Sequence, residues 1–172
     1  MGTFLLAVAA SGDSTRAAAG SVPLFSISKS ENKNRVEYAL RVDEHCTPVG
    51  QTPIFAYWRM LENDPVRTEP LLAREVPAYG LMGQHVTARG AGGGQVRATL
   101  RALPSREILV DASRDTGSGQ CRTWSTISIR GAPAHLYNVY VRLTWPFATV
   151  DYLLLQGWSL DGTHVVTEKI SP

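Results

Sequence analysis

The chain has 172 residues, of which 44% are hydrophobic and 19% charged, and its formal net charge at pH 7 is +2. This length and composition are typical of one globular domain that buries its own core, and they exclude a disordered chain. The small net charge and the scattered arginines give no reason to expect a nucleic-acid surface. No apolar run approaches the roughly 18 residues of a membrane-spanning segment.

The first residues resemble an export signal. An apolar run, FLLAVAA (residues 4–10), is followed by polar residues and then by the small residues 17–20. This is the order of the apolar core and cleavage region of a secretory signal peptide, although no Lys or Arg precedes the apolar run. We therefore predict a leader over residues 1–21, a single mature domain over residues 22–172, and a periplasmic or secreted location. A frayed tail or a short first helix is the alternative.

Residues 24–43 predict a β-hairpin. The segment RVEYALRV (residues 35–42) carries apolar side chains at every second position, which is the pattern of a strand with one buried and one solvated face. The turn before it contains Asn32 and Asn34, whose side chains commonly bond the local main chain. These asparagines have a second interpretation, as polar groups presented to a ligand.

The next segment, PIFAYWRML (residues 53–61), is apolar on both alternating faces and predicts a central strand covered on both sides. Arg59 is its exception, because a buried guanidinium needs a partner, and Glu62 and Glu75 are the candidates. Residues 62–70 contain two prolines and predict a loop. Residues 71–79 predict one short helix or turn.

The second half predicts only strands and turns. Residues 89–94, RGAGGG, lack the Gly-Lys-Ser/Thr ending and the flanking helix of a phosphate loop, so we expect a hairpin turn there. Strands are predicted over residues 84–88, 95–103, 106–112, 121–130, 135–145, 149–158 and 164–170. The sequence therefore indicates an all-β fold, a single antiparallel β-barrel or β-sandwich domain of about eight to ten strands.

The two cysteines, Cys46 and Cys121, leave two alternatives open. In an exported protein they could form one disulfide, and in a cytosolic protein they would be two buried thiols. The predicted leader favours the disulfide. The four histidines share no ligand spacing with one another or with a carboxylate, so we predict neither a metal site nor a cofactor.

Three groups of residues resemble a known family of bacterial exported proteins, domain of unknown function 4833. The groups are Ser30, Asn32 and Asn34; Pro53, Ile54, Tyr57 and Trp58; and Glu75, Ala78, Tyr79 and Gly80. The C-terminal residues Gly162, Glu168 and Lys169 are similar to the family's ending. The resemblance covers about residues 23–170 and implies an exported protein, but it implies no reaction.

The residues support two hypotheses about function. One is a non-catalytic binding module for a small amphipathic ligand or a protein partner, and the other is an enzyme on a barrel scaffold that uses Arg59 with Glu62 or Glu75 as an acid–base pair. We favour the binding module. Its candidate ligand-binding residues are Tyr57, Arg59, Glu75, Tyr79, Asn32 and Asn34.

Overall fold

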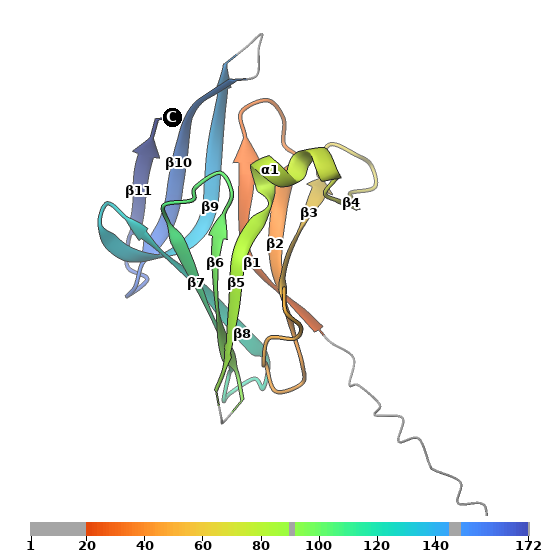
Figure 1. Ribbon diagram of the computed structural model, residues 1–172, viewed down its shortest axis with the longest axis vertical. Coiled ribbons are helices and arrows are strands. Elements are labelled where there is room, and N and C mark those ends of the chain that lie inside the picture. Colours follow the sequence, from red (N-terminus) through yellow and green to blue (C-terminus); the bar gives the residue numbers. More distant parts are fainter. Residues whose placement is uncertain (1–19, 90–91, 145–148, 172) are drawn as a thin grey trace, which may run out of the picture.

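The computed structural model describes residues 20–89, 92–144 and 149–171. The predicted leader lies outside these residues, except that Gly20 and Ser21 begin the first strand. The described residues form an all-β structure with one short helical segment, as predicted (Figure 1). They contain no helix long and apolar enough to cross a membrane.

Eleven strands are present in the described residues, one more than the upper end of the predicted range. In chain order they are β1 (Gly20–Lys29), β2 (Arg35–Val42), β3 (Ile54–Met60), β4 (Arg67–Pro70), β5 (Leu81–Ala88), β6 (Gly94–Leu100), β7 (Glu107–Arg114), β8 (Cys121–Ile129), β9 (Ala132–Thr144), β10 (Thr149–Ser159) and β11 (Val165–Ile170). The additional strand is β4, in a segment predicted as a loop. A 3₁₀ turn (Ala73–Glu75) leads into α1 (Val76–Tyr79), where the short helix was expected.

The long strand β9 joins the two halves of the sheet. One half runs β4-β3-β2-β1 and the other runs β5-β6-β7-β8, and both end on β9. Residues 132–135 of β9 pair with β8, and residues 138–141 pair with β1 in parallel. Strand β10 follows the opposite edge of β9 and carries β11 (Figure 1). The β1–β9 pair makes the sheet mixed, which corrects the prediction of a purely antiparallel one.

Apolar side chains from both halves form one core. Val36 and Leu40 of β2, Val96 of β6, Val110 of β7 and Leu155 of β10 have no exposed surface. Burying such a side chain contributes about 1.5–3 kcal/mol relative to leaving it in water. The alternating pattern of residues 35–42 therefore identified the buried face of β2 correctly.

The sheet is not closed into a barrel, because its two halves do not share a ladder where β3 and β5 approach each other. A side chain bridges these strands instead. The Gln84 side-chain amide in β5 accepts a hydrogen bond from the Ile54 N–H and donates one to the Ile54 carbonyl, each at 2.9 Å. One glutamine thus satisfies the backbone groups of Ile54 that a β3–β5 ladder would have paired.

A disulfide between Cys46 and Cys121 links the two halves, with Cα atoms 5.4 Å apart. Cys46 lies in the turn after β2 and is fully buried, while Cys121 begins β8. Of the two alternatives that the sequence left open, the structure contains the disulfide.

A partly buried ion pair joins the turn between β6 and β7 to β11. Arg106, in the turn before β7, donates to Glu168 Oε1 at 2.6 Å and to Oε2 at 2.7 Å, and it also donates to the Ser128 carbonyl. The Arg130 backbone N–H donates to Glu168 Oε2 at 2.6 Å. Bidentate pairs of this kind are strong and directional. The contacts lower the pKa of Glu168 from 4.5 to about 2, with the hydrogen bonds from Arg106 as the main cause.

Replacing both Cys46 and Cys121 with alanine should lower the free energy of unfolding by roughly 2–5 kcal/mol, because the disulfide closes a loop between residues 75 apart. Urea denaturation followed by tryptophan fluorescence measures the loss. The reduced wild-type protein is the matched control and should lose a similar amount. An unchanged unfolding midpoint in the double variant would contradict the crosslinking role.

The Glu168→Gln variant should be less stable than wild type at pH 7 by about 2 kcal/mol, since it loses charge-assisted hydrogen bonds. The folded-state pKa lies below the unfolded value, so the carboxylate stabilises the fold above about pH 4.5 and loses this effect as the pH falls towards 2. The difference between variant and wild type should therefore shrink over that range in urea titrations. Glu107→Gln is the control, because Glu107 is exposed and its pair with Arg97 spans 4.0 Å. A constant difference from pH 7 to pH 2 would contradict the assignment.

Candidate functional site

A pocket of about 500 Å³ lies beside β3, between the β1–β2 turn, β4 and the 3₁₀ turn. We call it the Trp58 pocket. Its lining residues are Lys29, Asn32, Asn34, Trp58, Met60, Glu69, Pro70, Leu72, Arg74 and Glu75. The volume lies within the range of small-molecule sites, and the lining combines apolar surface with a few polar groups, as such sites do.

Trp58 is held in place from several sides. Its indole N–H donates to Glu75 Oε2 at 3.0 Å, and its ring packs edge-on against Tyr79 at 5.3 Å between centroids. The Lys29 ammonium lies 5.1 Å from the indole centroid, within range of a cation–π contact. These contacts fix the indole ring as a preformed wall of the pocket.

The short helical segment is attached through Glu75 and Tyr79. Glu75 Oε2 also accepts the Leu72 backbone N–H at 2.8 Å, which caps the 3₁₀ turn. The Tyr38 hydroxyl of β2 donates to the Tyr79 carbonyl at 2.6 Å, so α1 is tied to the core. Burial, and then the charges of Glu75 and Glu31, raise the pKa of Tyr79. Glu75 therefore acts here as a hydrogen-bond acceptor that orders its surroundings.

The side-chain oxygens of the two asparagines in the β1–β2 turn accept hydrogen bonds from backbone N–H groups. Asn32 Oδ1 accepts the Asn34 N–H at 3.1 Å, and Asn34 Oδ1 accepts the Glu62 N–H at 3.1 Å. Neither side-chain NH₂ group donates a hydrogen bond to any residue that the structure describes. Asn32 therefore bonds the turn itself, whereas Asn34 joins the turn to the residue that follows β3, and two amide donors remain at the pocket wall.

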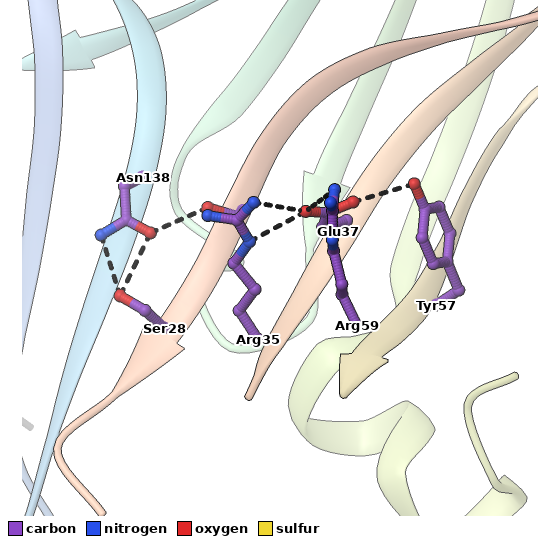
Figure 2. A network of polar contacts seen from close by, with 7 residues as sticks. Ser28, Arg35, Glu37, Tyr57, Arg59 and Asn138 are labelled. Atoms are coloured by element: carbon purple, nitrogen blue, oxygen red, sulfur yellow. Dashed lines mark hydrogen bonds and ion pairs between the residues drawn. The ribbon is translucent and has the colours of Figure 1, made fainter. Parts of the chain in front are cut away.

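Tyr57 and Arg59 lie on the other face of β3, because neighbouring residues of a strand point to opposite sides. Both contact Glu37 of β2: the Tyr57 hydroxyl donates to Oε2 at 3.0 Å, and Arg59 Nη1 donates to Oε1 at 3.3 Å (Figure 2). Arg35 adds two contacts to Oε1, at 2.7 and 2.8 Å. Burial and the hydrogen bond to Glu37 raise the pKa of Tyr57.

This arrangement corrects two predictions. Arg59 does not pair with Glu62 or Glu75 in the described part of the chain, and its side chain is 44% exposed. Strand β3 is not a central strand covered on both sides, because only the four-residue β4 lies beyond it and its outer face is open. Phe55, Tyr57 and Arg59 have apolar bodies and polar or cationic neighbours, so they suit a half-exposed face. The hydrophobic pattern of the sequence alone does not distinguish such a face from a buried one.

The contacts around Glu37 continue in a polar row across the sheet. Gln156, Asn138, Ser26, Glu37 and Tyr57 are register partners on β10, β9, β1, β2 and β3. Asn138 donates to Gln156 at 2.8 Å and accepts from Ser26 at 3.1 Å. It also accepts from Ser28 at 3.2 Å (Figure 2). The row pins the register of the parallel β1–β9 junction.

The structure thus divides the six predicted ligand-binding residues. Asn32, Asn34 and Glu75 line the Trp58 pocket, Tyr79 supports its wall, and Tyr57 and Arg59 face away from it. Sequence reasoning missed Lys29 and Trp58, although the alternation of Tyr57 with Trp58 indicates that the two rings face opposite sides. No group of three or more metal-ligating side chains occurs among the described residues.

Comparison with protein families identifies the family of this chain. The model of a domain of unknown function, DUF4833, matches residues 25–169, which is most of the chain and includes every residue lining the Trp58 pocket. Neither the curated proteins nor the solved structures contain a significant match.

Proposed function

Because this chain belongs to the DUF4833 family, whose description assigns no activity, we propose its function from the geometry: a non-catalytic binding module that holds a small amphipathic ligand in the Trp58 pocket. The observation that carries the proposal is the fixed indole ring facing a pocket of ligand size. A wall that is ordered before the ligand arrives reduces the entropy lost on binding.

The lining indicates the chemistry of the ligand. Trp58, Met60, Pro70 and Leu72 offer apolar surface for a ring or chain. Around it stand the NH₂ groups of Asn32 and Asn34, the Lys29 ammonium and the Arg74 guanidinium, all of them hydrogen-bond donors. A ligand with an apolar body and an anionic, acceptor-bearing end fits this combination.

The acidic residues of the lining are already engaged. Glu75 accepts from Trp58 and Leu72, and Glu69 pairs with Arg67 at 2.9 Å. Lys29 has only a 3.9 Å contact with Glu31, and Arg74 has no ion-pair partner among the described residues. The groups that remain to contact a ligand are therefore hydrogen-bond donors, two of them cationic, which supports a ligand with an anionic, acceptor-bearing end.

The alternative enzyme hypothesis required Arg59 to act with Glu62 or Glu75. Arg59 contacts Glu37 on the outer face of β3, whereas Glu75 bonds Trp58 on the pocket face. An acid–base pair must meet at one reacting group, so this separation favours the non-catalytic function.

The aromatic anion 1-anilinonaphthalene-8-sulfonate tests the pocket, since its rings match Trp58 and its sulfonate matches Lys29. We expect saturable one-to-one binding by fluorescence titration, weakened about tenfold in Lys29→Gln, which is the loss of one charge-assisted hydrogen bond. Lys33→Gln is the matched control, because Lys33 is exposed in the same turn but does not line the pocket. Equal affinities in both variants, or no saturable binding, would contradict the proposal and favour a protein partner.

We also propose that the protein is exported. The disulfide supports this location, because structural disulfides persist in oxidising compartments. Expression in a bacterial host followed by cell fractionation and intact-mass measurement should place the protein in the envelope without its first ten to twenty residues, roughly the length of a signal peptide. A cytosolic product that retains Met1 would refute export.

A further inference from the structure

Three exposed aromatic side chains gather at one place on the surface. Trp124 of β8 is 42% exposed, Tyr137 of β9 is 37% exposed and Trp158 of β10 is 43% exposed. They are the three aromatic residues among the exposed large hydrophobic residues of the described chain, and all three line a cleft of about 330 Å³. We call it the aromatic cleft. Clustered exposed aromatic rings usually mark a binding surface.

The cleft forms where β8 leaves β9. The β8–β9 ladder includes Thr126 and His135 but not Trp124 or Tyr137, so the two strands are no longer paired at the aromatic residues. Leu24 and Leu136 also line the cleft, and the two rings of the pair Trp124 and His135 stand at 87° to each other. The topology thus makes an opening with ring walls.

A bulge turns Tyr137 outward. Leu136 pairs with Gly157 and Asn138 pairs with Gln156, so Tyr137 is an extra residue on β9 without a partner on β10. Bulges commonly redirect a side chain next to a functional site. Gly157 is required opposite the bulge, because a Cβ there would lie 2.8 Å from Ile129 Cδ1 and 3.0 Å from the His135 carbonyl oxygen.

The cleft offers hydrogen bonds but no charge. None of its lining residues is Asp, Glu, Lys or Arg. The nearby carboxylate of Asp161 accepts hydrogen bonds from Ser159 and Thr163 within its own turn. Among the described residues, neither indole N–H of the cleft has an acceptor, and the buried Ser125 hydroxyl in its wall has no partner. An ion would gain little here, whereas a neutral ligand rich in hydroxyl groups would supply acceptors to the two exposed indole N–H groups.

From these observations we propose that the aromatic cleft binds the pyranose ring of a neutral sugar. The weakly positive C–H groups of such a ring are attracted to the negative faces of Trp124 and Trp158. Its hydroxyl groups bond the indole N–H groups and the His135 ring. The cleft volume is at the small end for ligand sites, so it holds one ring at a time, either a free monosaccharide or one unit of a glycan chain. This site is separate from the Trp58 pocket and does not rest on the function proposed for it.

Nuclear magnetic resonance of the full-length ¹⁵N-labelled protein tests the proposal through the indole N–H signals. The probes are the methyl glycosides of glucose, galactose, mannose and N-acetylglucosamine, together with cellotetraose and chitotetraose, each at up to about 10 mM, beyond which a site is very weak. At least one sugar should shift the Trp124 and Trp158 signals saturably and leave the Trp58 signal unchanged. A tetrasaccharide that binds about tenfold more tightly than its monosaccharide indicates a glycan chain, and equal affinities indicate a single ring.

Trp124→Ala and Trp158→Ala should each weaken the binding sugar about tenfold, with an unchanged circular dichroism spectrum because both side chains are exposed. Tyr152→Ala is the matched control, since Tyr152 lies on the same strand as Trp158 but outside the cleft, beneath Lys169. The proposal is overturned if no sugar shifts the two signals, if Tyr152→Ala weakens binding equally, or if the signals depend on protein concentration alone, which would show that a second copy covers the rings.

Discussion

The fold depends on one constraint, that β9 must pair with two different strands along a single edge. Its first residues pair with β8 and its later residues pair with β1, while β10 pairs with residues 134–144 along the opposite edge. Strand β9 has 13 residues, long enough to serve both partners in turn. Because the two halves of the sheet start from one strand, their apolar faces meet in one core rather than two.

Away from β9, side-chain interactions join segments that are not paired by backbone hydrogen bonds. The Cys46–Cys121 disulfide, the Gln84 side chain on Ile54, and the Arg106–Glu168 pair each join segments that backbone hydrogen bonds leave separate. All three act between residues 30 or more positions apart, so they fix tertiary arrangement and leave secondary structure to local pairing. Between β3 and β5, the Gln84 side-chain amide joins the two strands at Ile54 alone. A full ladder at this place would have closed the sheet.

Local patterns in the sequence predicted the strands well and their neighbours poorly. The alternation in residues 35–42 identified β2 and its buried face, and the short helical segment lies within the predicted residues 71–79. By contrast, Asn138 and Ser26 are 112 positions apart and no local pattern connects them. Arg59 was misjudged for the same reason: whether a strand of mixed aromatic and cationic residues is central or near an edge depends on its neighbours, which periodicity does not encode.

The two candidate binding sites lie where strand pairing changes. The aromatic cleft opens where β8 leaves β9, and the Trp58 pocket lies where the short β4 and the β1–β2 turn end beside β3. A continuous ladder holds strands a fixed short distance apart and presents a flat face of side chains. At these two sites the interruption of pairing leaves depth for a ligand and exposes aromatic side chains that form the walls. The topology around β9 that builds the core therefore also determines where on its surface this protein has room to bind.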